Sequence, residues 1–111
     1  MRIERTVASP VSVAELAGIS GTLRVDVPGD SLGTIFVDRG RVWADETASR
    51  ADAVAVVDVQ GDFERILRGE FDLVVAEVKG RIELRGNSEL ATRIIIALNV
   101  AKPFAMRRDD E

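Results

Sequence analysis

Three glycines and one aspartate between positions 69 and 86 constrain the fold of this chain more than any other feature. Gly69 is placed to end a helix in the left-handed conformation, and Asp72 is placed to cap the next helix with its carboxylate. Gly80 can end that second helix, and Gly86 separates a strand over 81–85 from a helix that begins at 87 or 88. The stretch therefore predicts two short helices, a strand and a longer final helix.

This stretch, Gly69 to Gly86, resembles the signature of the sterol carrier protein-2 family. In that family a helix ends near the first glycine, an aspartate opens a second short helix, and a strand between the last two glycines leads into the final helix. The resemblance covers roughly Gly21 to Val100. It implies an α+β fold in which a five-stranded, mostly antiparallel sheet carries helices on one face.

The residues before this stretch predict a meander of strands. From Gly21 the apolar residues Leu23, Val25 and Val27 alternate with polar ones, which is typical of a half-buried strand. The same pattern and its turn residues predict further strands over 33–38, 41–46 and 53–59, with a short hairpin loop at 38–40. The apolar run 53–59 indicates a strand that is covered on both faces. Ser9 and Pro10 predict a short helix over about 10–17.

One segment gives conflicting signals. The valines within 73–78 favour a strand, whereas the resemblance implies a short helix there. Because capping residues stand at both ends of the segment, we expect the helix. A second helix is expected from Asp62, as its cap, to Gly69, with Phe63, Ile66 and Leu67 at helical spacing.

The length of 111 residues suits one domain. We expect an N-terminal segment with a short helix over 1–20, a core similar to sterol carrier protein-2 over 21–101, and a charged tail over 102–111. Any ligand site must therefore lie within that one core.

Composition excludes several classes of function. The chain has 15 basic and 19 acidic residues, no segment gathers the basic ones, and nucleic acid is therefore not an expected partner. No apolar run reaches the length of a membrane span, and the first residues lack a secretory signal, so we expect a cytoplasmic protein. Nearly all the positive charge is arginine, which is typical of a bacterial genome rich in G and C.

The chain contains no histidine, cysteine or tyrosine. The commonest general base, the thiol nucleophile and thiolate metal ligands are therefore absent, and neither a metal nor another cofactor is expected. Among the carboxylates, Asp58 lies in the apolar run before a turn. It is either an acceptor for a ligand hydroxyl or, as we favour, a partner of the turn backbone. Asp45 and Glu46 end a strand and are expected in solvent.

The final helix, 88–101, has two distinct faces. The residues Leu90, Ala91, Ile94, Ala97, Leu98 and Ala101 share one face, which is expected to pack on the sheet. Glu89, Arg93, Ile96 and Val100 form a stripe on the other side. Two large apolar residues on this stripe indicate that the tail folds back, that a second subunit forms a homodimer through Ile96 and Val100, or that a ligand enters there.

The resemblance also implies an apolar tunnel between the sheet and the helices, with room for a sterol, a fatty acyl chain or another lipid. The residues expected to line it occupy inward positions: Trp43, Phe63, Leu67, Phe71, Leu84, Ile94, Leu98 and Phe104. The expected function is non-catalytic intracellular binding or transfer of such a ligand. The alternatives are an enzyme or enzyme accessory in the biosynthesis of a hydrophobic metabolite, and a dimerisation or docking module.

Overall fold

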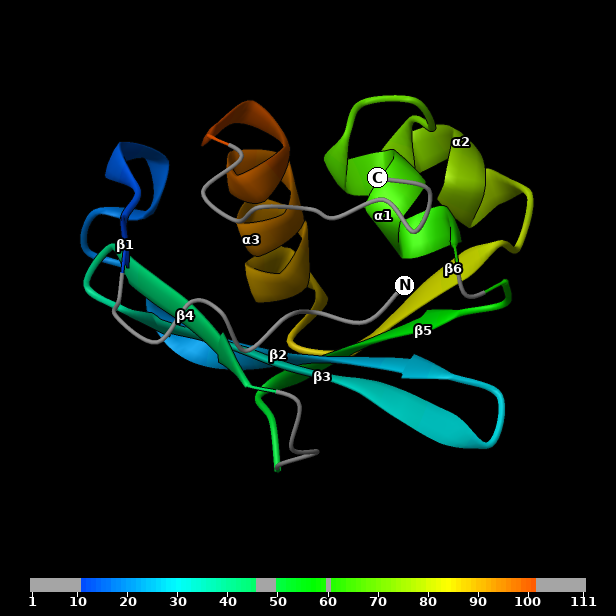
Figure 1. Ribbon diagram of the computed structural model, residues 1–111, viewed down its shortest axis with the longest axis horizontal. Coiled ribbons are helices and arrows are strands. Elements are labelled where there is room, and N and C mark those ends of the chain that lie inside the picture. The colour runs from blue at the N-terminus through cyan, green and yellow to red at the C-terminus, as the bar shows by residue number, and fades with distance from the viewer. Residues whose placement is uncertain (1–10, 46–49, 60, 102–111) are drawn as a thin grey trace, which may run out of the picture.

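The computed structural model describes residues 11–45, 50–59 and 61–101, which form one sheet with helices on one face. The elements follow in the order β1 (Val11–Ser12), η1 (Ala14–Leu16), β2 (Ser20–Val27), β3 (Asp30–Asp38), β4 (Arg41–Asp45), β5 (Ala53–Val57), α1 (Asp62–Leu67), α2 (Leu73–Val78), β6 (Ile82–Gly86) and α3 (Ser88–Ala101). The described helices all lie above the sheet in Figure 1. The predicted α+β architecture is confirmed.

The sheet is mostly antiparallel, as expected, and its strand order is β1-β4-β3-β2-β5-β6. The exception is β5, which pairs with β2 in parallel, Leu23 opposite Ala53. The two-residue β1 adds a short edge strand to the five longer ones. The tight connection from β3 to β4 places both Arg39 and Gly40 at positive φ, 50° and 87°, as the favoured two-residue hairpin turn requires.

The N-terminal helix predicted over 10–17 is wrong for the described part of that range. Val11 and Ser12 pair with Val42 and Arg41 of β4, and only Ala14–Leu16 forms a single 3-10 turn. The reason is that the extended backbone here finds strand partners: the Val13 N–H donates to the Gly40 carbonyl at 2.7 Å. β-branched residues at 11 and 13 fit this extended path.

The core lies between the sheet and the helices. It contains the alternate residues of β2 to β5 that point towards the helices, together with Phe63 and Ile66 of α1 and Ile94 and Leu98 of α3. The outward valines of β5, at 54 and 56, are half-buried. The run 53–59 is therefore fully covered on one face only, and the strand ends at Val57.

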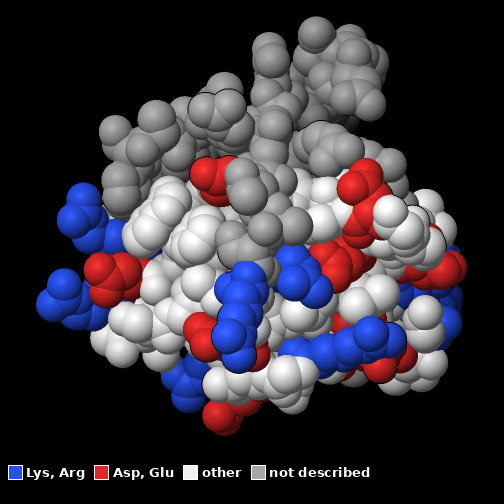
Figure 2. All heavy atoms as spheres, turned by 90° about the horizontal axis from the view of Figure 1, so that it is seen from below, with Lys and Arg blue, Asp and Glu red and all other residues white. Residues whose placement is uncertain are grey.

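The opposite face of the sheet carries charged side chains of both signs, which alternate across the view in Figure 2. Arg24 and Asp26 form an ion pair on this face at 3.0 Å. Of the helices that the structure describes, none is long and apolar enough to cross a membrane.

Candidate functional site

The helices α1 and α2 are positioned by the residues that the sequence singled out. Gly69 and Gly80 adopt φ of +78° and +72°, as predicted for residues that follow helices. The Val75 N–H donates to Asp72 Oδ1 at 3.0 Å, so Asp72 caps α2 as expected. This cap outweighs the β-propensity of three valines, and 73–78 is a helix.

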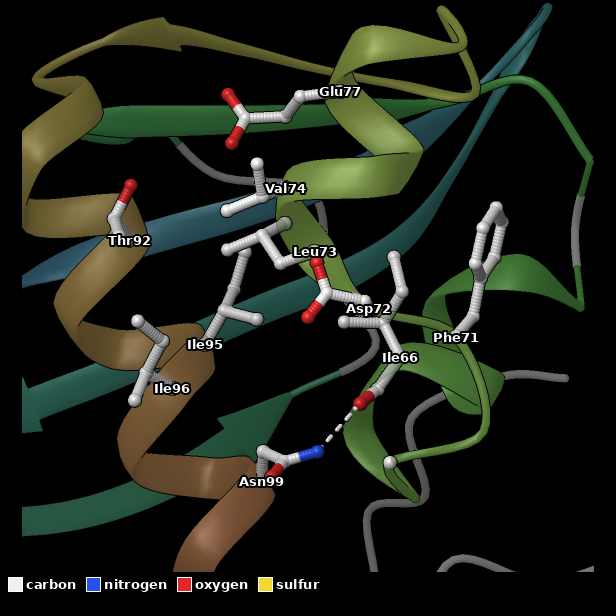
Figure 3. A pocket seen from close by; sticks show the side chains of 11 residues that line it. Ile66, Phe71, Asp72, Leu73, Val74, Glu77, Thr92, Ile95, Ile96 and Asn99 are labelled. Atoms are coloured by element: carbon white, nitrogen blue, oxygen red, sulfur yellow. Dashed lines mark hydrogen bonds between the residues drawn. The ribbon is translucent and has the colours of Figure 1, made fainter.

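A groove with a volume of about 310 Å³ opens between α2 and α3. Figure 3 shows how its two long walls face each other, with Leu73 and Val74 on α2 opposite Ile95 and Ile96 on α3. It is lined by residues from four neighbouring segments: Ile66, Gly69, Phe71, Asp72, Leu73, Val74, Glu77, Thr92, Ile95, Ile96 and Asn99. Most of these side chains are apolar, so the groove suits an apolar ligand.

Asn99 closes one end of the groove. Its amide Nδ2 donates to the Ile66 carbonyl at 2.7 Å and to the Leu67 carbonyl at 3.4 Å. These carbonyls belong to the last turn of α1, where the helix leaves carbonyl groups without partners inside the helix. Asn99 therefore fixes α3 to the end of α1 beside the groove.

Two carboxylates stand on the α2 side of the groove. The side chains of Asp72 and Glu77 both point from α2 towards α3 in Figure 3, and both residues are exposed. The neutral polar residues Thr92 and Asn99 stand on the α3 side, and among the described lining residues there is no lysine or arginine. The polar part of the groove is thus neutral on one wall and acidic on the other.

Phe71 forms another part of the groove wall, and the side chains of two arginines lie over its ring. The guanidinium carbons of Arg65 and Arg81 lie 5.2 and 5.6 Å from the ring centroid. Both guanidiniums bind the carboxylate of Asp62, at 3.3 Å for Arg65 and 2.8 Å for Arg81. The four side chains form one cluster behind the groove.

This cluster corrects the expectation for Asp62. The cap residue of α1 is Gly61, and no side chain caps this helix. Asp62 is instead the first helical residue and only 1% exposed. Its carboxylate turns inward because two arginines supply the opposite charge that burial requires.

A second charged group lies at the end of α1. Arg68 pairs with Glu70 at 2.7 Å and with Glu64 at 3.2 Å. The hydrogen bond to Glu70 raises the pKa of Arg68 above its usual value, against the opposing effect of burial. These pairs fix the backbone at the end of α1, where the connection to α2 begins.

Of the eight residues expected to line a cavity, Phe71 lines this groove. Phe63, Leu67, Ile94 and Leu98 are buried in the core, and Leu84 packs against it half-buried. Phe104 lies outside the described residues. Inward-facing positions thus identify the packed core, whereas the groove lies at the solvent-facing border between two helices.

Trp43 lies on the other side of the sheet. Its neighbours Val42 and Ala44 point into the core, so the alternation of β4 turns Trp43 away from the helices. There its ring stacks on Phe36, with centroids 5.4 Å apart and planes inclined by 8°. Trp43 was expected to line a tunnel, but it does not line this groove.

The lining residues that the sequence did not predict come from the end of α1, the connection to α2, α2 itself and α3. Ile96 had been noted on the exposed stripe, where a ligand entrance was one of three explanations. It is both 53% exposed and part of the lining. Val74 and Val78 of α2 are 65% and 82% exposed. Such exposed valines on a short helix are the signal that could have indicated where the groove opens to solvent.

The other carboxylates considered in the sequence are not among the residues that line the groove. Asp58 is exposed just after β5, and its N–H donates to the Arg81 carbonyl. Asp45 is half-buried at the end of β4, and Glu46 lies outside the described residues. Within the described ranges, no three acidic side chains come together as a metal site would need.

Comparison with known proteins identifies the fold. No protein-family model and no curated protein matches this sequence. In structure, the chain is similar to the ubiquinone synthesis protein UbiJ-SCP2, with a TM-score of 0.60 and 20% identity over 89% of this chain and 84% of that one. It is also similar to a crystal structure of sterol carrier protein 2, with a TM-score of 0.55 and 20% identity over 95% of this chain and 87% of that one.

A third similar structure is an enzyme, the stereoselective inverting sec-alkylsulfatase Pisa1 from Pseudomonas sp. The TM-score is 0.64 and the identity 14% over 78% of this chain. This chain corresponds to only 14% of the length of the sulfatase. Together these similarities show that the chain has the sterol carrier protein-2 fold.

Proposed function

We propose that this protein binds a hydrophobic small molecule or a single lipid chain in the groove between α2 and α3, and carries it without catalysing a reaction. The observation that carries the proposal is the mostly apolar groove between α2 and α3, on a fold shared with sterol carrier protein 2. A cytoplasmic location, expected from the sequence, belongs to the same proposal.

The size of the groove favours a slender ligand. Its volume of about 310 Å³ is at the small end of the range for ligand sites. A medium-length alkyl chain that buries about 300 Å² would gain on the order of 7 kcal/mol at roughly 25 cal/mol per Å². Association costs several kcal/mol of that gain, which leaves about 4 kcal/mol and predicts dissociation constants of about 1 mM.

The described lining offers no pairing of a nucleophile with a general base. Its functional groups are two carboxylates, one hydroxyl and one amide that is already bonded to α1. Carrying a ligand requires none of these to react, which supports binding over catalysis.

Displacement of a neutral fluorescent dye tests the proposal. N-phenyl-1-naphthylamine should bind saturably to the purified protein and be displaced by dodecanol. Ile96→Trp places a larger side chain in the groove and should weaken dye binding at least fivefold. Val59→Trp is the matched control, because Val59 is similarly exposed at 47% but lies outside the lining. If wild-type protein binds neither dye nor dodecanol, the proposal fails.

The exposed apolar residues of α2 and α3 favour a second function for this surface, as a protein interface. Val74 and Val78 of α2 and Ile96 and Val100 of α3 present apolar side chains to solvent. Such a surface could join two copies of this chain, or dock the protein on an enzyme of hydrophobic-metabolite biosynthesis, as an accessory. The similarity to a ubiquinone synthesis protein favours the accessory among these alternatives.

Val100 separates these uses, because it belongs to the exposed stripe and not to the groove lining. Val100→Glu should convert a dimer to a monomer in sedimentation while leaving dye binding intact. A wild-type protein that sediments as a monomer at high micromolar concentration excludes the homodimer.

A further inference from the structure

We propose that the groove selects amphiphiles by the charge of their polar end: it prefers a long-chain amine, accepts a neutral alcohol and disfavours a carboxylate. This inference rests on the proposed function, and it adds the class of headgroup to it. The apolar lining binds the alkyl chain, and the two acidic residues on one wall determine which polar end group is preferred.

The placement of the carboxylates carries the argument. Asp72 and Glu77 both point from α2 across the groove towards α3. An alkyl chain that lies against Leu73, Ile95 and Ile96 would bring its polar end near one or both of them. An ammonium group there gains an opposite charge, whereas a carboxylate meets like charge.

The two arginines beside Phe71 do not reverse this sign. Arg65 and Arg81 lie against the Phe71 ring, and neither is a lining residue. Both are bound to the buried Asp62 carboxylate. Within the part of the chain that the structure describes, the charged groups that line the groove are therefore acidic.

The size of the effect follows from the exposure of these residues. Exposed ion pairs change an equilibrium constant by roughly 1.5- to 5-fold each, so two carboxylates give roughly a 2- to 25-fold preference. At about 1 M salt the screening length falls to about 3 Å, and the preference should largely disappear.

Three ligands with the same dodecyl chain test the inference: dodecylamine, dodecanol and dodecanoate, each displacing N-phenyl-1-naphthylamine at pH 7 in low salt. We expect dodecylamine to bind more tightly than dodecanol, and dodecanol more tightly than dodecanoate. The double variant D72N/E77Q should bring the three affinities within about twofold of one another. Asparagine can still cap α2, so the helix is retained.

Glu15→Gln is the control, since it removes one charge from an exposed residue of η1 outside the lining. It should leave the order of the three ligands unchanged. If dodecanol does not displace the dye, the proposed function fails. If dodecanol binds but dodecanoate binds as well as dodecylamine, or D72N/E77Q leaves the order unchanged, this inference fails while the proposed function stands.

Discussion

Asp62 Oδ2 lies 2.8 Å from Arg81 Nη2, and this contact joins the first turn of α1 to the residue that precedes β6. Asp62 is almost completely buried, whereas the Arg81 side chain retains 36% of its exposure. The same arginine lies over Phe71 in the groove wall. The ion pair therefore links the packing of α1 to the shape of the candidate site.

Asp62→Asn should lower the free energy of unfolding by about 2–3 kcal/mol, because hydrogen bonds to charged groups contribute about that much. It should also weaken dye binding, since Arg65 and Arg81 lose the carboxylate that holds them against Phe71. Urea unfolding and dye titration measure the two effects. Asp58→Asn, at an exposed position, should change stability by less than about 0.5 kcal/mol. Equal stability of the two variants would contradict the assigned role of Asp62.

Asp72 has a structural role that its charge does not determine. Asp72→Ala removes the acceptor for the Val75 N–H and should destabilise the protein by about 1 kcal/mol. Asp72→Asn keeps an oxygen at that position and should cost only a few tenths of a kcal/mol. Thermal unfolding followed by circular dichroism distinguishes the two. A loss as large for asparagine as for alanine would show that the carboxylate charge, and not the cap, is required.

Leu98→Trp tests whether the interior beneath α3 is solid. Leu98 is 1% exposed and outside the groove lining, so the larger side chain should overpack the core and cost about 1–3 kcal/mol. The protein that remains folded should still bind the dye. Loss of dye binding with unchanged stability would instead indicate a ligand cavity at this depth, as the sequence-based lining predicted.

Trp43 emission should not respond to a ligand in the groove, because the sheet separates the indole from the helices. Phe36→Leu should alter the emission, since Phe36 stacks on the indole. The double variant W43F/F71W moves the single tryptophan into the groove wall, and its emission should shift when dodecanol binds. A ligand-dependent shift in wild-type emission would place a binding site on the outer face of the sheet.

The sequence predicted elements well where a local signal was decisive. Asp72 and Gly80 identified α2 although its valines favour a strand, and the alternation of Leu23, Val25 and Val27 identified β2. The helix over 10–17 was wrong because distant residues of the chain offer strand partners: β4 pairs with Val11–Ser12, and Gly40, just before β4, accepts the Val13 N–H. A pairing partner of that kind leaves no trace in a short window of sequence.

The candidate site was harder to predict than the fold. Inward positions such as Phe63 and Leu98 were expected to line a tunnel, and the structure places both in the core cluster, so their part in a ligand cavity stays a prediction. The groove depends on how separate helices pack together, and the Asn99 bonds that join α3 to α1 connect residues 33 and 32 positions apart, beyond the reach of local sequence patterns. Phe71 was expected to line the tunnel on the same ground of an inward position, and among the described residues of that set it is the one that lines the groove.

The lining residues that the structure describes all come from one uninterrupted stretch of chain, 66–99. The meander β2-β3-β4 supplies a large share of the core and none of these residues. Substitutions that change what the groove accepts can therefore accumulate in one half of the chain while the other half keeps the sheet intact. Exchanging this single stretch between proteins of the same fold is a direct way to transfer ligand preference as a cassette.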